Sequence, residues 1–174
     1  ADPLVWWVPS RHLGFEVLGS GQPHYHFGTL GQLQLGESFA KVFLKTTHQL
    51  IEPEQPGRGG DFPFAKTKPI KVFILAGTRN MEGEESFIAE LAELGDVAQL
   101  IQPQADVLYR CLLGGAAYQS LQWQALGPIE NYLETFGPEL SFGQALRSAS
   151  SDPIAIIKVT DGCAVMLDWD HTLS

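Results

Sequence analysis

The chain has 174 residues, is 44% hydrophobic and 18% charged, and carries 11 Lys plus Arg against 20 Asp plus Glu, for a formal net charge of -9. This size and apolar content fit one folded domain and exclude a disordered chain. The acidic balance argues against nucleic acid or an anionic membrane as the main partner, because both select clustered Lys and Arg. No apolar run approaches the ~20 residues that span a bilayer, so no transmembrane segment is expected.

Cysteine usage and the first residue say little about the compartment. Cys111 and Cys163 are too few for a disulfide scaffold and lack the Cys-x-x-Cys spacing of redox or zinc sites. The chain begins with Ala1 rather than Met, which indicates processing or excision, and removal of an export signal would make the location extracytoplasmic. We hold that location as an expectation, and no motif calls for a cofactor.

The first third of the chain combines an apolar run with a helical pattern. Residues 4–8, Leu-Val-Trp-Trp-Val, predict a buried strand. From Thr29 to about Leu50 the apolar residues recur at helical spacing. Gly31 and Gly36 weaken the first turns, so the firm helix is predicted to begin near Glu37.

A stretch dense in Pro and Gly follows, at residues 52–69. Such a density of helix and strand breakers predicts a loop or linker. It divides the chain into an N-terminal segment, residues 1–51, and an α/β core, residues 70–174.

After the linker, strand and helix patterns alternate. Buried strands are predicted for apolar runs bounded by turn residues, and helices where apolar residues recur every three or four positions. Strands are predicted at 70–76, 106–113, 153–159 and 163–167, a turn at 77–82, and helices at 83–94 and 138–148. The helix 83–94 is expected to end at Gly95 and to point Phe87, Ile88, Leu91 and Leu94 inward. This order is typical of a parallel α/β sheet with helices on its faces.

One segment resembles the first block of the sialate O-acetylesterase-like (SASA) carbohydrate esterases. It covers residues 69–83 and reads Pro-Ile-Lys-Val-Phe-Ile-Leu-Ala-Gly-Thr-Arg-Asn-Met-Glu-Gly. These esterases are SGNH-type α/β hydrolases in which a strand leads into Gly-Gln-Ser-Asn-Met, the Ser being the nucleophile. The likeness continues through 136–143, Phe-Gly-Pro-Glu-Leu-Ser-Phe-Gly, and the strand 153–159, which in the family runs into a Gly-Gly turn and here into Asp161-Gly162. The resemblance covers residues 70–169 and implies a three-layer parallel sheet with helices on both faces.

Residues 1–50 resemble the C-terminal part of the same family. Trp6-Trp7 resembles the strand that precedes a Gln-Gly-Glu block in the family. Residues 24–27, His-Tyr-His-Phe, resemble the block that holds the catalytic His. Of the two histidines, His26 fits the family's spacing better than His24. The family's end would then precede its beginning, through a circular permutation, the tail of one copy joined to the head of the next, or an assembled chain. The expected fold is therefore SGNH-like but incomplete or rearranged, and proximity of His26 to Arg79 would favour the permutation.

Arg79 stands at the nucleophile position that the resemblance implies. A guanidinium has no lone pair to attack a carbonyl and stays protonated at any working pH. The family's orienting Asp falls on Pro23, or on Gly21 if His24 is the catalytic position, and neither residue carries a carboxylate. Val8-Pro9-Ser10 replaces the Gln-Gly-Glu block. Loss of the nucleophile alone removes on the order of 10⁶ in rate from a Ser-His unit, so esterase activity is expected to be absent. What remains of the family's apparatus is His26, Gly162 and the backbone at 79–80.

Two interpretations of the strand–turn–helix at 70–95 stay open. In one it is scaffolding, and Asn80 and Met81 are turn and packing residues, because function lives in sites grafted on folds. In the other, Gly77, Arg79 and Asn80 form a binding site at the carboxyl end of the strand, where Arg79 holds a carboxylate or sulfate. The partners expected are a carbohydrate or acidic ligand, or other proteins in an assembly.

Two further patterns in the sequence bear on chemistry. Residues 164–173 resemble the first motif of haloacid-dehalogenase-type phosphatases, with Asp168 as nucleophile and Asp170 as acid/base at Mg²⁺, but the residues that follow supply no Lys or further acidic ligand. His24 and His26 share one side of a strand without a Cys or carboxylate nearby, so no metal site is predicted. Ser86 and Ser141 are expected to be helix residues rather than a replacement nucleophile.

The sequence therefore predicts a catalytically degenerate SASA/SGNH-like domain that acts as a binding or structural module, for example as a subunit of a larger assembly. The alternative is an active carbohydrate O-acetylesterase that hydrolyses acetyl esters on sugars. A third function class, a phosphatase, would depend on Asp168 and Mg²⁺.

Overall fold

The computed structural model describes residues 8–10, 13, 15–17, 23–46, 69–113, 118–120, 122–129 and 134–161. Its main sheet has five strands, in the order β3-β7-β4-β5 with β6 also paired to β4. They are β3 (Lys71–Gly77), β4 (Gln104–Leu113), β5 (Tyr118–Gln119), β6 (Gln124–Leu126) and β7 (Ile154–Thr160). Strands β3, β7 and β4 are parallel, whereas β5 and β6 are antiparallel to β4, so the sheet is mixed. The predicted α/β class is confirmed.

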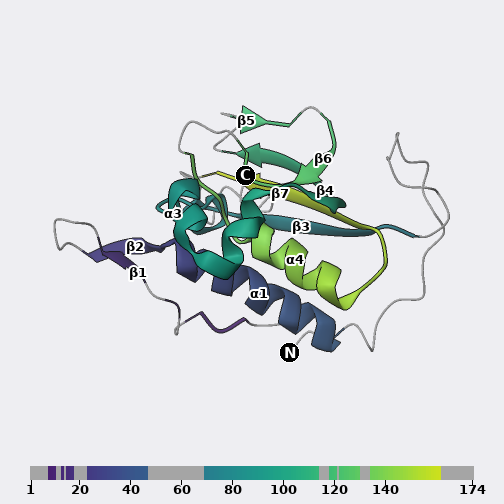
Figure 1. Cartoon of the computed structure of the whole chain (residues 1–174), viewed down its shortest axis with the longest axis horizontal. Helices are drawn as coiled ribbons and strands as arrows, with labels where there is room; N and C mark the ends of the chain where they lie inside the picture. The colour runs from purple at the N-terminus through teal and green to yellow at the C-terminus, as the bar shows by residue number, and fades with distance from the viewer. Residues whose placement is uncertain are drawn as a thin grey trace, which may run out of the picture.

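Two helices, α1 (Thr29–Thr46) and α4 (Glu139–Ala149), lie side by side across one face of this sheet (Figure 1). The ring of Phe73 on β3 meets Phe43 of α1 and Phe142 of α4 edge-on, with centroid distances of 4.7 and 5.3 Å. Such edge-to-face pairs add to the burial of apolar area. Because side chains alternate along a strand, Phe73 and Leu75 face the helices, and Val72 and Ile74 point to the opposite face.

Helix α1 begins at Thr29, eight residues before the predicted firm start at Glu37. The physical reason is packing between helices. A Cβ added at Gly36 would collide with the hydroxyl of Ser141 in α4 and with the carbonyl oxygen of Pro138, the residue directly before α4. Gly36 therefore lets the two helices approach closely, and their packing outweighs its low helix propensity.

The predicted helix 83–94 is wrong in its first part. The chain instead forms α2 (Arg79–Glu82) inside the predicted turn 77–82, α3 (Ile88–Glu93), and a 3₁₀ helix, η2 (Gly95–Ile101). Gly83 and Glu85 have φ of 98° and 68°, and a helix cannot continue through left-handed residues. Of the residues predicted to point inward, Leu91 is buried, but Phe87 and Leu94 are 39% and 37% exposed.

Three of the predicted strands and one helix are confirmed within one to two residues, as β3, β4, β7 and α4. The antiparallel pair β1 (Phe15–Val17) and β2 (Pro23–Phe27) was not predicted. Three predicted elements lie outside the described residues, apart from Val8 and Pro69. They are the strands 4–8 and 163–167 and the linker 52–69. None of the described helices has the length and apolar character that a membrane crossing requires.

Candidate functional site

The carboxyl end of β3 leads directly into α2. The amides of Met81 and Glu82 both donate to the carbonyl oxygen of Thr78, at 2.9 Å each, and close a tight turn after the strand. Gly77 lies under this turn, where an added Cβ would come within 2.8 Å of the Met81 Cβ. Gly77, predicted as part of a binding site, thus serves the close approach of α2 to the sheet.

Arg79, the first residue of α2, forms an ion pair with Glu84. Its Nε lies 3.4 Å from Glu84 Oε2, and one terminal nitrogen donates to Glu84 Oε1 at 3.4 Å. Both side chains are partly exposed, and pairs of this kind contribute only about 0–1 kcal/mol to stability. The pair matters for the anion-binding interpretation, which requires the Arg79 guanidinium to contact a ligand. In the structure a carboxylate of the same chain, that of Glu84, contacts this guanidinium.

Asn80 connects α2 to the N-terminal segment. Its side-chain oxygen accepts a hydrogen bond from the amide of Phe27 at 3.0 Å, and its carbonyl oxygen accepts one from the Gln32 side chain at 2.6 Å. The hydroxyl of Ser86 donates to the carbonyl oxygen of Phe27 at 2.9 Å. We call these three bonds the β2 latch, since they hold the end of β2 and the start of α1 against α2 and the segment that follows it.

The β2 latch bears on the predicted catalytic position. His26 directly precedes Phe27 in β2, and Arg79 directly precedes Asn80, so the bond from the Phe27 amide to the Asn80 side chain holds the two segments next to each other. The side chain of His26 and the whole of Gly162 lie outside the described residues, as does the 164–173 motif.

A buried ion pair lies behind the turn, where sequence analysis predicted no functional group. Lys158 Nζ on β7 lies 2.8 Å from Glu139 Oε2 at the start of α4, and the two side chains are 2% and 3% exposed. Lys158 also donates to the Glu82 carbonyl oxygen at 3.1 Å, and the Gly137 amide donates to Glu139 Oε1 at 3.1 Å. These bonds satisfy both charges and join β7, α2 and α4 at the carboxyl end of the sheet.

Glu82, the last residue of α2, is itself buried. Burial raises the pKa of its carboxyl, and the nearby Lys158 opposes this effect, while Glu84 and Asp161 add to it. Perturbed carboxyls of this kind occur at functional sites and in structural ion-pair networks alike. Here the contact between Lys158 and the Glu82 backbone marks a structural network.

Ser86 and Ser141 have structural roles and are not replacement nucleophiles. Ser141 lies in α4, as predicted, and donates to the Pro138 carbonyl oxygen at 3.3 Å. Ser86 is not a helix residue but lies between α2 and α3, where it forms part of the β2 latch. Within the described ranges, no three His, Cys, Asp or Glu side chains gather into a group that could hold a metal ion.

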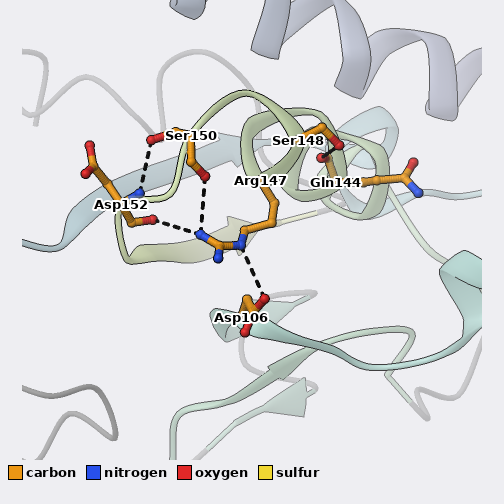
Figure 2. Close-up of polar contacts among 6 residues, drawn as sticks. All are labelled: Asp106, Gln144, Arg147, Ser148, Ser150 and Asp152. Atoms are coloured by element: carbon orange, nitrogen blue, oxygen red, sulfur yellow. Dashed lines mark hydrogen bonds and ion pairs between the residues drawn. The ribbon is translucent and has the colours of Figure 1, made fainter.

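A separate hollow of about 280 Å³ lies at the amino end of β4, beside the last turns of α4. Arg147 at its rim donates to Asp106 Oδ2 at 3.3 Å and to the carbonyl oxygens of Ser150 and Asp152 at 3.2 and 3.4 Å (Figure 2). The guanidinium therefore closes the carboxyl end of α4. Apart from Arg147 and Asp106, the polar side chains that line the hollow are neutral. They belong to Gln99, Gln102, Gln104, Gln144 and Ser148.

The network around Lys158 was missed because the contacts that form it join residues far apart in sequence. The available signal was a lone Lys within the apolar run 154–159, together with a Glu directly after Pro138. A charged residue in a buried strand requires a buried partner. No protein-family model, curated protein or solved structure matches the chain.

Proposed function

We propose that the chain is a catalytically degenerate SGNH-like domain, resembling the SASA carbohydrate esterases, that acts as a binding or structural module. The observation that carries this proposal is the Arg79–Glu84 ion pair at the carboxyl end of β3. Acyl transfer requires a hydroxyl or thiol at that position, activated by a neighbouring base. A guanidinium offers neither a lone pair nor a removable proton.

We further infer that the family's motifs are permuted within a single domain of three layers. The β2 latch supports this inference, because it joins the segment that contains His26 to the segment that contains Arg79. The parallel strands β3, β7 and β4, with α1 and α4 on one face, are compatible with an SGNH-like core. A tail from a neighbouring copy would not need such bonds within one chain.

Of the two kinds of partner expected, an anionic ligand at Arg79 would compete with groups of this same chain. Glu84 already occupies the Arg79 guanidinium, and Asn80 uses its side-chain oxygen in the β2 latch. An acidic sugar would have to displace a carboxylate of this same chain. The structural role therefore comes first in this proposal.

The test is hydrolysis of 4-nitrophenyl acetate by the full chain, beside the variants Arg79→Ala and His26→Ala. We expect the three proteins to give the same background rate, because none contains a paired nucleophile and base. Arg79→Ser, which restores a hydroxyl at the implied position, should also stay at background, since Pro23 supplies no carboxylate to orient His26.

Two results would contradict this proposal. Hydrolysis that survives Arg79→Ala and disappears in His26→Ala would identify an active esterase with its nucleophile elsewhere. Mg²⁺-dependent hydrolysis of 4-nitrophenyl phosphate that Asp168→Asn abolishes would identify a phosphatase.

A further inference from the structure

The hollow at the amino end of β4 receives polar side chains from two helical elements. Gln99 in η2 and Gln102 directly after it line one part, and Gln144 and Ser148 of α4 line another. Residues three or four positions apart on a helix lie on one face, so each element presents its pair to the same hollow. Because β3, β7 and β4 are parallel, this end of the sheet is opposite to the end that leads to Arg79.

Three side-chain amides at the hollow are available to a ligand. Within the part of the chain that the structure describes, the side chains of Gln99, Gln102 and Gln144 form no hydrogen bond. Gln104 differs, because its Nε2 donates to the Leu140 carbonyl oxygen at 3.0 Å and so belongs to the fold. Each available amide offers two N–H donors and one carbonyl acceptor.

The two charged side chains at the hollow compensate each other. Arg147 Nε donates to Asp106 Oδ2 at 3.3 Å, and Arg147 also donates to the carbonyl oxygens of Ser150 and Asp152 (Figure 2). All other residues that line the hollow are uncharged. A charged ligand would therefore meet no unpaired opposite charge there, and the formal net charge of -9 further disfavours an anion.

The deepest residues of the hollow are apolar. Val107 is 0% and Leu100 2% exposed, and Pro103 and Ala105 add apolar atoms to the lining. Apolar walls with a few well-placed polar groups are usual in small-molecule sites. The volume of about 280 Å³ lies just below the range of roughly 300–1,000 Å³ that is typical of drug-sized ligands, so the hollow suits a ligand of one ring.

We propose that this hollow binds an uncharged, hydroxyl-rich ring, which is the chemistry of a single neutral sugar residue. A hydroxyl group both donates and accepts hydrogen bonds, as a side-chain amide does, so each of the three amides can pair with it in either direction. The C–H groups of the ring would contact Leu100 and Val107. With so few contacts, the affinity should be no better than millimolar.

Titration followed by two-dimensional ¹H–¹⁵N spectra of the full chain tests the proposal, because each glutamine side-chain amide gives its own pair of signals. The probes are methyl β-glucopyranoside, methyl β-galactopyranoside and methyl α-mannopyranoside. We expect at least one of them to shift the side-chain signals of Gln99, Gln102 and Gln144 in a saturable way. Gln34, an exposed glutamine on α1, should not shift. The charged methyl glucuronide and methyl glucosaminide should bind more weakly.

Two variants and one control locate the binding. Gln144→Ala removes one hydrogen-bonding partner and should weaken binding about two- to tenfold. Ala105→Trp fills the hollow from an exposed position on β4 and should abolish binding, with the remaining signals showing that the fold is kept. Gln34→Ala is the matched control and should leave the affinity unchanged.

Three results would overturn the proposal. They are the absence of a saturable shift with all three neutral probes, binding that is unchanged in both Gln144→Ala and Ala105→Trp, and equal binding of the charged and neutral rings. None of these results depends on whether the chain hydrolyses esters, so the proposed function and this inference can fail separately.

Discussion

Glu82 links the protonation of one carboxyl to the stability of the fold. Burial raises its pKa above 4.5 in the folded chain, so between 4.5 and that raised pKa the folded state holds this proton more tightly than the unfolded state. The free energy of unfolding should therefore fall as pH rises through this window, and the loss should persist above it. We expect Glu82→Gln to remove this part of the pH dependence and to be more stable than the parent at neutral pH.

Urea unfolding of both proteins, in small steps from pH 4 to pH 8, measures the effect. Glu93→Gln is the matched control, since it removes the same charge from an exposed position on α3. A Glu82→Gln curve that runs parallel to that of the parent would show that this carboxyl does not set the pH dependence.

Arg79 and Lys158 differ in how far their roles could be predicted from the sequence. The chemistry at Arg79 could be read from one position, because a guanidinium cannot act as a nucleophile in any environment. The environment of Lys158 could not be predicted in this way. Its partner Glu139 precedes it by 19 residues, and the carbonyl oxygen of Glu82 precedes it by 76. Only the packing of β7 against α2 and α4 brings these groups together.

Gly36 sets the distance between α1 and α4. Replacement by Ala should gain up to about 1 kcal/mol of helix propensity. Against this gain, the new methyl group would collide with the Pro138 carbonyl oxygen and the Ser141 hydroxyl, and overpacking of this kind costs about 1–3 kcal/mol. The steric cost is the larger of the two, so we expect Gly36→Ala to lower the free energy of unfolding.

Thermal unfolding followed by far-ultraviolet circular dichroism provides the measurement. Ser38→Ala, two residues along α1, gives the control, since its hydroxyl bonds only to the Gln34 carbonyl oxygen within the helix. An increase in the midpoint for Gly36→Ala would mean that the helices separate at little cost.

Elements were predictable where the local pattern agreed with the tertiary environment. The apolar runs of β3, β4 and β7 are long enough to identify buried strands, and Pro138 marked the start of α4. The pattern failed at Phe87 and Leu94, whose spacing suits an inward helix face. The left-handed residues Gly83 and Glu85 interrupt that helix. Gly83 is the usual residue at a left-handed helix end, whereas nothing in the local sequence required the positive φ of Glu85. The β1–β2 pair was not identified although Gly19-Ser20-Gly21 lies between its strands, because strands of three and five residues give little pattern.

At the scale of the whole molecule, the β2 latch and the packing of α1 on α4 join residues 23–46 to the strands and helices that follow the predicted linker 52–69. If both parts form one cooperative unit, they must unfold together. Hydrogen exchange measured by mass spectrometry at increasing urea should then give the same midpoint for peptides from α1 and from β7.

Asn80→Ala tests that coupling directly. It removes the acceptor of the Phe27 amide, and an unsatisfied amide in a partly buried site costs about 1–3 kcal/mol. In a single unit, this loss should lower the midpoints of α1 and β7 peptides equally. Thr78→Ala is the neighbouring control, because Thr78 is exposed and its side chain makes no capping bond. If α1 alone loses protection while β7 keeps its midpoint, the N-terminal segment is an independently folding arm. The permuted-domain interpretation would then be wrong, even though both segments contact each other in the folded chain.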